Sequence, residues 1–188
     1  MTSFYLEEEL SRLGFEAIGT GCKISRNAKF YGIKNISIGN NVRIDDFCII
    51  SGKVKLGSNI HISPYVALYG AKGITFEDYT GISAHSVVYS AMDDFSGNYL
   101  IGPIHPDEYT NVTGGKVTVK RFSQIGANCV VFPNLTIAEG VAIGAMSMVK
   151  EDLEPWTIYA GIPAKKLKNR SSAMLKYVGL NNVMVGGG

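Results

Sequence analysis

A branched aliphatic residue recurs every six positions along most of this chain, and that period limits the possible folds more than any other feature. The recurring positions run through Ile38–Leu68, slip by two residues, and continue through Phe76–Val88. The same rhythm returns over Val119–Val149. An apolar or small residue stands two positions before most of them. Because side chains two residues apart on a strand share a face, each unit is predicted to be a short strand with both side chains inward.

The positions between these pairs favour sharp turns, as in Gly39-Asn40-Asn41, Gly57-Ser58-Asn59 and Gly126-Ala127-Asn128. Glycine and asparagine tolerate the left-handed backbone region that a tight corner needs. A chain with an inward pair and a corner every six residues forms coils, and stacked coils form a parallel β-helix. An α-helix is excluded because a six-residue period drifts around its 3.6-residue turn and leaves no fixed apolar stripe.

Composition narrows the class of protein. A hydrophobic content of 46% with 18% charged residues argues against disorder. The net charge of +2 gives no support for a nucleic-acid partner, and no apolar run is long enough to span a membrane. The N-terminal residues combine Ser3 and Glu7–Glu9 with apolar side chains, which predicts a capped amphipathic helix and not a basic signal peptide. We therefore expect a cytoplasmic protein.

The chain is predicted to form one domain over residues 1–188. Its expected parts are an N-terminal helix (1–15), a β-helix in two blocks (18–88 and 117–153), a loop between the blocks (89–116) and a C-terminal extension (154–188). A loop of that length in a compact domain usually has a function. In the extension, Ser171 or Ser172 is expected to cap a short helix reaching about Tyr177, and Gly186–Gly188 are expected to be disordered.

The repeats, the interruption and the ending Trp156–Lys165 closely resemble the hexapeptide-repeat acyltransferases over about residues 18–170. The resemblance implies an all-β, left-handed parallel β-helix, a homotrimer and acetyl-CoA as cosubstrate. The loop segment Tyr89–Gly97 is most similar to enzymes that N-acetylate nucleotide-linked amino-dideoxy sugars, such as dTDP-4-amino-4,6-dideoxyglucose. Such enzymes contribute to O-antigen, capsular and other surface polysaccharides. In agreement with a trimer, five aromatic residues are expected outside the core: Tyr65, Tyr69, Tyr79, Phe122 and Phe132.

Relatives of this fold that acetylate hydroxyl groups carry a catalytic histidine near the loop. Counting along the repeat places that position on Asp93 or within a residue or two of it, where this chain has no histidine. A hydroxyl must lose its proton as it attacks a thioester, whereas a neutral amine already presents its lone pair. A carboxylate that orients the amine and accepts its proton is then sufficient. Asp93 and Asp94 are therefore the candidate catalytic residues; the alternative is a solvated acidic turn.

Each of the three histidines has a structural alternative. His85 lies at a corner just before the loop and is the further candidate proton acceptor. His61 is expected on the outward side of a strand, at the surface or a subunit contact. His105, within the loop, is a candidate for closing over the substrate.

Coenzyme A needs a channel with free backbone groups for its pantetheine arm and cations for its phosphates. Small residues recur just after the apolar beat and are expected to stack on successive coils. By resemblance, Ala127 and Ala145 contact the arm, while Lys150, Lys165 and Lys168 lie near the adenine and phosphate end. The alternative for the lysines is a solvated basic tail.

Three other functions remain open from the residues. An O-acetyltransferase would act on a sugar hydroxyl. A β-helical metal enzyme would need three converging histidines, and His61, His85 and His105 are separated by about one coil each. No close histidine pair occurs, and no metal is expected. A trimeric scaffold would explain the repeat but not the long loop.

The three cysteines, Cys22, Cys48 and Cys129, are expected to be buried.

Overall fold

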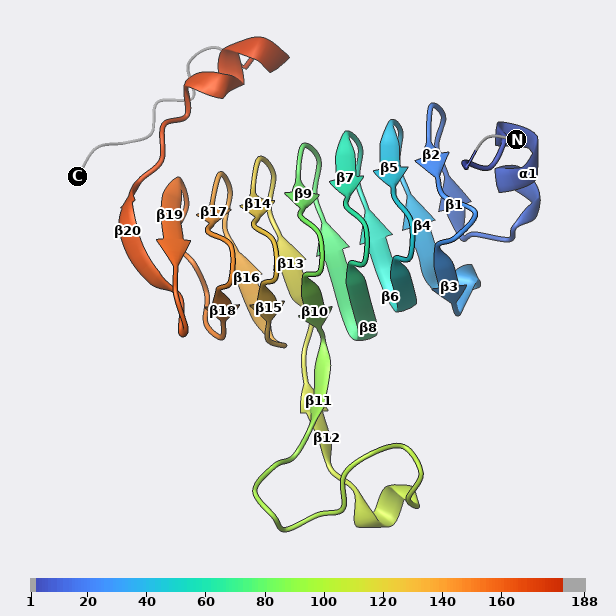
Figure 1. Cartoon of the computed structure of the whole chain (residues 1–188), viewed down its shortest axis with the longest axis vertical. Helices are drawn as coiled ribbons and strands as arrows, with labels where there is room; N and C mark the ends of the chain where they lie inside the picture. The colour runs from blue at the N-terminus through green and yellow to red at the C-terminus, as the bar shows by residue number, and fades with distance from the viewer. Residues whose placement is uncertain (1–2, 181–188) are drawn as a thin grey trace.

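The computed structural model describes residues 3–180 and confirms the parallel β-helix (Figure 1). One sheet has eight strands, ordered β2 (Lys23–Ile24), β5 (Val42–Ile44), β7 (Ile60–Ile62), β9 (Gly81–Ile82), β14 (Gln124–Ile125), β17 (Ala142–Ile143), β19 (Thr157–Ala160) and β20 (Lys165–Asn169). All neighbours in it are parallel except β19 and β20, which form an antiparallel hairpin.

The second sheet has ten strands and covers the other two sides of the coil. Its strands are β1 (Ala17–Ile18), β3 (Lys29–Tyr31), β4 (Ile36–Ile38), β6 (Ile49–Leu56), β8 (Ala67–Phe76), β10 (Val87–Tyr89), β13 (Val117–Val119), β15 (Val130–Val131), β16 (Leu135–Ile137) and β18 (Met148–Val149). The long strands β6 and β8 each run through a corner, so the sheet has two faces. The apolar face contains β3, residues 49–51 and 67–69, β10, β15 and β18. The polar face contains β1, β4, residues 54–56 and 74–76, β13 and β16.

Two corners position the candidate site. The alanine corner is the turn that follows β5, β7, β9, β14 and β17, and it holds residues 45–47, 63–65, 83–85, 126–128 and 144–146. The loop corner lies between the apolar and polar faces, where β6 and β8 bend and where residues 90–116 leave the coil. The apolar face therefore has the alanine corner along one edge and the loop corner along the other.

The six-residue beat forms the core, as the sequence predicts. Ile44, Ile62, Ile82 and Ile125 lie in one column and are fully buried. Burying an isoleucine side chain contributes about 1.5–3 kcal/mol, and each coil adds several such residues. One aromatic prediction is wrong. Phe122 is only 5% exposed, because its ring packs between those of Tyr79 and Trp156, with centroids 5.2 and 6.3 Å away.

The N-terminal helix is shorter than predicted. Helix α1 spans Glu7–Arg12, and Leu6, not Ser3, is its N-cap residue. The Glu9 side chain accepts a hydrogen bond from the Leu6 backbone N–H, which satisfies the start of the helix. Preceding residues extend the coil instead, since the Tyr5 N–H donates to the Ile24 carbonyl. No helix among the described residues is long and apolar enough to cross a membrane.

The interruption is not a loop throughout. β11 (Ala91–Asp93) and β12 (Val112–Gly114) form an antiparallel ribbon that projects from the solenoid and carries residues 94–111 at its end (Figure 1). The short helix η2 (Asp107–Tyr109) lies in that end, and η1 (Ile33–Asn35) precedes β4. In the described part of the C-terminal extension, the last element is η3 (Ala173–Val178), a 3₁₀ helix that follows Ser172. Gly186–Gly188 lie outside the described residues.

Candidate functional site

Small residues stack in line along the alanine corner. The backbone N–H of Ser83 donates to the Ile125 carbonyl at 2.9 Å, one coil on, and Gly126 and Gly144 repeat this contact with the coils beyond them at 2.8 Å. Ser83, Gly126 and Gly144 thus occupy equivalent positions on successive coils. A Cβ atom on Gly126 would lie 2.6 Å from the Ala145 nitrogen, so this position requires glycine.

The next position of each turn forms a second row. The Asn128 N–H donates to the Ala84 carbonyl at 3.0 Å, and the Met146 N–H donates to the Ala127 carbonyl at 2.8 Å. These bonds place Ala84, Ala127 and Ala145 at equivalent corner positions. The two rows together make a strip of small side chains along the corner, and such a strip lets a thin chain such as pantetheine lie close to the coil.

Towards the N-terminus the same corner becomes aromatic. Phe47, Tyr65 and His85 occupy equivalent positions, with ring centroids 5.0 and 4.7 Å apart. The His85 ring lies nearly parallel to that of Tyr65, at 6°, and is exposed. Ser83 therefore lies where the small-residue strip meets this aromatic stack.

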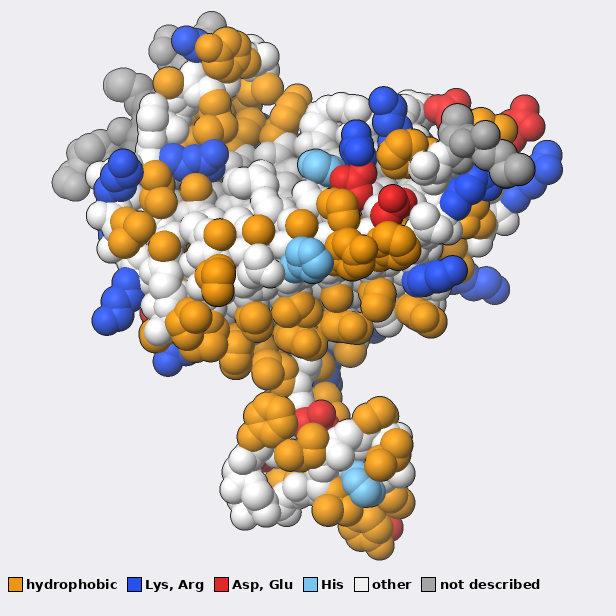
Figure 2. All heavy atoms as spheres, viewed as in Figure 1, with side chains coloured by type: hydrophobic (Ala, Val, Ile, Leu, Met, Phe, Trp, Pro, Cys, Tyr) orange, Lys and Arg blue, Asp and Glu red, His pale blue; other side chains and the backbone are white. Residues whose placement is uncertain are grey.

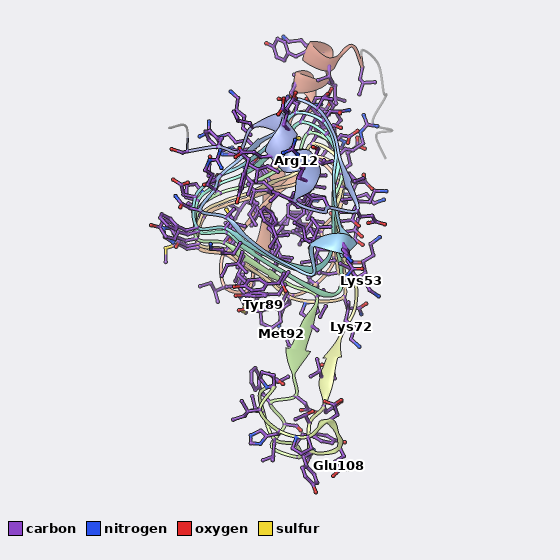
Figure 3. The ribbon with its side chains drawn as sticks, turned by 90° about the vertical axis from the view of Figure 1, so that its right-hand side faces the viewer. Arg12, Lys53, Lys72, Tyr89, Met92 and Glu108 are labelled. Carbon is purple, nitrogen blue, oxygen red and sulfur yellow. The ribbon has the colours of Figure 1, made fainter. Side chains whose placement is uncertain are left out.

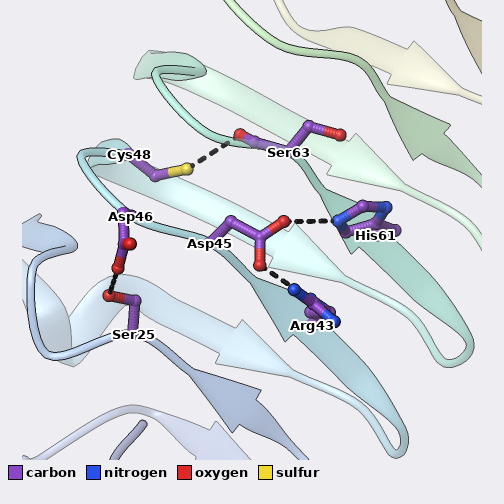
Figure 4. Close-up of polar contacts among 7 residues, drawn as sticks. All are labelled: Ser25, Arg43, Asp45, Asp46, Cys48, His61 and Ser63. Atoms are coloured by element: carbon purple, nitrogen blue, oxygen red, sulfur yellow. Dashed lines mark hydrogen bonds and ion pairs between the residues drawn. The ribbon is translucent and has the colours of Figure 1, made fainter. Parts of the chain in front are cut away.

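His61 is held away from this stack by an acidic partner (Figure 4). Its Nε2 atom lies 2.6 Å from Oδ2 of Asp45, and the other oxygen of Asp45 accepts a hydrogen bond from Arg43 Nε at 2.7 Å. Burial alone would raise the pKa of Asp45, but the hydrogen bonds from His61 and Arg43 outweigh it and lower that pKa. His61 lies on the outward side of β7, as the sequence predicts.

Asp93 ends strand β11 and lines a cavity of about 310 Å³ within the projecting loop. His105 lines the same cavity, so the structure brings together two of the sequence candidates. Asp93 Oδ1 has one weak hydrogen bond, from the Gly102 N–H at 3.4 Å. Its carboxylate therefore keeps most of its capacity to accept further hydrogen bonds.

Asp94 is engaged in a turn. One of its carboxylate oxygens accepts the Ser96 N–H at 2.7 Å, and the other accepts the Asn111 side-chain amide at 2.8 Å. These bonds, that of the Ser96 backbone first, lower the pKa of Asp94. A carboxylate made less basic and already bonded at both oxygens is a poor proton acceptor. The geometry of Asp94 fits the structural alternative considered from the sequence.

The candidate lysines do not form a single cluster within the protomer. Lys165 and Lys168 lie exposed on β20, opposite Ala160 and Ile158 of β19, beyond the C-terminal end of the small-residue strip. Lys150 follows β18, at the loop-corner end of the apolar face. The neighbouring Lys166 pairs with Glu154 at 2.9 Å.

Cysteine and metal chemistry have no support in the described part of the chain. Cys22, Cys48 and Cys129 are all buried, as predicted, and burial raises the pKa of the Cys48 thiol to about 11. Between residues 3 and 180, no three histidine, cysteine, aspartate or glutamate side chains are close enough to hold a metal ion. The three histidines lie apart: His61 against Asp45, His85 on Tyr65 and His105 in the loop cavity.

Comparison with known proteins identifies the family. No protein-family model matches the chain. It is, however, 45% identical over 176 residues to a dTDP-4-amino-4,6-dideoxy-D-glucose acyltransferase of Escherichia coli, covering 92% of both chains. This chain belongs to the hexapeptide-repeat acyltransferases. The acyltransferase is also similar to AntD, an N-acyltransferase from Bacillus cereus solved with dTDP and 3-hydroxybutyryl-CoA, with 52% identity, a TM-score of 0.93 and coverage of 95% and 96% of the two chains.

Other AntD structures carry replacements of one serine, or of one aspartate ten positions further along, and two of them contain dTDP-4-amino-4,6-dideoxyglucose and coenzyme A. A hexapeptide-repeat acetyltransferase of Vibrio cholerae, at 20% identity and a TM-score of 0.59 over 88% of this chain and 80% of its own, shares the fold. The family resemblance seen in the sequence is thus confirmed.

Sequence reasoning did not single out Ser83. Ser83 stands one position after the Ile82 beat, as Gly126 and Gly144 stand after theirs. That equivalence was present in the period. Ser63 makes the same contact one coil earlier, with its N–H donating to the Ile82 carbonyl at 3.0 Å, so the period alone does not distinguish Ser83.

Proposed function

We propose that the protein transfers the acetyl group of acetyl-CoA to the amino group of dTDP-4-amino-4,6-dideoxyglucose or a similar nucleotide-linked sugar. The observation that carries this proposal is the similarity to AntD at 52% identity, since AntD binds dTDP-4-amino-4,6-dideoxyglucose together with coenzyme A. The product would enter surface polysaccharide synthesis. A cytoplasmic location, expected from the sequence, remains part of this proposal.

Ser83 and Asp93 are the proposed polar groups at the reacting atoms. Among all serines of the chain, Ser83 alone has an aspartate ten positions further along. The spacing is that of the serine and aspartate replaced in AntD. Ser83 lies in the same row as Gly126 and Gly144, and among residues 3–180 the Asp93 carboxylate accepts one weak hydrogen bond. Both observations suit groups that contact a substrate.

These two residues come from opposite edges of the apolar face in one protomer, so a second copy is needed to bring them together. The outward side chains of that face include Val87, Val130 and Met148, which are neighbours in register, and the stacked pair Tyr69 and Tyr89. Figure 2 shows hydrophobic side chains gathered along the side of the solenoid from which the loop projects. Such a patch indicates an interface.

A homotrimer would bury this face. If three copies turn their apolar faces towards a three-fold axis, the alanine corner of each meets the loop corner of the next. The Asp93 loop of one protomer then lies near Ser83, Ala127 and Ala145 of its neighbour. Lys150 follows the loop corner as well, so the same arrangement brings it towards the neighbouring β20 with Lys165 and Lys168.

The proposed chemistry is direct attack of the sugar amine on the thioester carbonyl carbon. Asp93 accepts a hydrogen bond from the amine, orients its lone pair, and takes the proton released as the C–N bond forms. Ser83 donates a hydrogen bond to the carbonyl oxygen of the thioester, or relays the proton released by the amine nitrogen. The C–S bond then breaks, and the thiolate of coenzyme A recovers the proton. The products are the amide and free coenzyme A.

An acceptor panel tests this function. Amino and hydroxy sugar nucleotides are incubated with acetyl-CoA, with 3-hydroxybutyryl-CoA as the comparison donor, and free thiol is measured. Turnover is expected with dTDP-4-amino-4,6-dideoxyglucose and absent with the 4-hydroxy analogue. Turnover confined to hydroxyl acceptors would make the protein an O-acetyltransferase and remove the proposal.

The lysines of β20 give a second prediction. Lys165→Gln with Lys168→Gln should weaken binding of coenzyme A by about tenfold and reduce its dependence on salt, because two exposed cations near the phosphates are lost. Isothermal titration with coenzyme A and with its dephospho form measures this. The dephospho form should lose less affinity than coenzyme A does. Equal losses for both ligands would show that these lysines do not contact the 3′-phosphate.

A further inference from the structure

A second cavity lies on the polar face, away from the small-residue strip. It measures about 310 Å³, and its polar lining includes Lys53, Lys55 and Lys116 with Asn35, Ser37 and Thr75. We call it the lysine groove. Ser37, Lys55 and Thr75 are partners in register on β4, β6 and β8, so their side chains point outward side by side.

Glycine opens the groove at its centre. Gly73 has a φ of +103° in the bend of β8, and a Cβ atom there would lie 3.7 Å from Cγ of Lys116. The Lys116 side chain therefore extends over the coil that carries Gly73, towards the coil of Lys53 and Lys55. Figure 3 shows Lys53 and Lys72 on the side of the solenoid opposite to Tyr89, close to where the β11–β12 ribbon leaves.

The groove carries an excess of positive charge. Its lining contains three lysines and one acidic residue, Glu16. Among residues 3–180, the ion pairs involve other side chains, and none includes Lys53, Lys55 or Lys116. Lys53 and Lys55 lie two residues apart on β6, and Lys116 directly precedes β13, with β8 between the two strands, so three like charges line one cavity and repel one another. A grouping of this kind is favourable when a multivalent anion occupies it.

We propose that the lysine groove binds the diphosphate of the acceptor nucleotide, an assignment that rests on the proposed function. The groove adjoins the loop corner, which in the proposed trimer meets the neighbouring alanine corner at Ser83. The small-residue strip runs from Ser83 towards the C-terminus and is assigned to coenzyme A. The groove, spanning β4 to β13, extends from the same level towards the N-terminus. The two substrates thus approach from opposite ends.

The test uses dTDP as the probe and the full-length protein. Lys53→Gln with Lys116→Gln should raise the dissociation constant of dTDP about tenfold and flatten its salt dependence, while the dissociation constant of coenzyme A changes less than twofold. Lys23→Gln with Lys120→Gln removes two lysine charges outside the groove and should leave both constants unchanged. In turnover assays, the groove variant should raise KM for the amino sugar nucleotide and not for acetyl-CoA.

Two results would overturn the assignment. One is an unchanged dissociation constant of dTDP in the groove variant. The other is binding of wild-type protein to phosphatidylglycerol vesicles, but not to phosphatidylcholine vesicles, that the groove variant loses while dTDP binding stays intact. That result would assign the groove to lipid phosphates. Since wild-type turnover in the acceptor panel is measured separately, the groove can fail while the proposed function stands.

Discussion

Replacing Asp93 by asparagine is expected to lower kcat by on the order of 10²–10⁴, the usual effect of losing an acid–base group. Within the described part of the chain, the carboxylate of Asp93 accepts only one weak hydrogen bond and lines a cavity, so it is available to hold the amine and take its proton. Asparagine keeps the size but donates through its amide nitrogen and does not accept a proton. Pre-steady-state and steady-state turnover with the amino sugar nucleotide measure the loss.

Asp94 and His85 supply the controls. Asp94→Asn should cost far less in kcat, because both oxygens of Asp94 already serve the turn and its pKa is lowered there. His85→Asn should also cost little, since the ring stacks on Tyr65. The rising limb of the pH profile should be set by the pKa of the sugar amine, in wild type and in His85→Asn alike. If that limb disappears in His85→Asn while Asp93→Asn stays active, His85 is the base.

The fold was predictable because the β-helix repeats one local rule. Inward pairs such as Ile60 and Ile62, followed by a corner, are visible as a six-residue period, and each coil needs only its neighbours to form. The N-terminal helix was overestimated for the opposite reason. Its amphipathic pattern extends over residues 1–15, but pairing of the Tyr5 backbone with Ile24 competes with helix for the first residues. That pairing is long-range and leaves no local signal.

The candidate site was predictable in part. Counting the repeat located Asp93. It could not distinguish Asp93 from Asp94, because the two differ in the hydrogen bonds that Ser96 and Asn111 make across the loop. The strip through Ala127 and Ala145 followed from small residues at a fixed spacing. Ser83 carried no signal of its own. Ser63 occupies the equivalent position one coil earlier, so the six-residue period did not distinguish Ser83 from it.

Placing a charge on the apolar face should dissociate the proposed trimer and strongly lower activity. Val130 is central to that face, in register between Val87 of β10 and Met148 of β18. In the proposed trimer, Val130→Asp would bury an unpaired carboxylate three times around the axis, which costs more than the interface can supply. Light scattering should change from three times 20.3 kDa to 20.3 kDa. Activity should fall by on the order of 10² or more, because Ser83 and Asp93 of different protomers separate.

Thr118→Asp is the matched control. Thr118 occupies the corresponding outward position on the polar face, in register between Thr75 and Thr136. The Thr118→Asp variant adds the same charge to the same kind of short strand, so any general effect of that charge on the folding of the coil appears in both variants. Thr118→Asp should remain trimeric, and it should stay active when assayed at a saturating concentration of the amino sugar nucleotide, because its partner in register, Thr75, lines the lysine groove. A Val130→Asp variant that stays trimeric would place the interface elsewhere. A monomeric variant that keeps full turnover would show that one protomer holds the whole site, and the assignment of Ser83 and Asp93 to neighbouring protomers would be wrong.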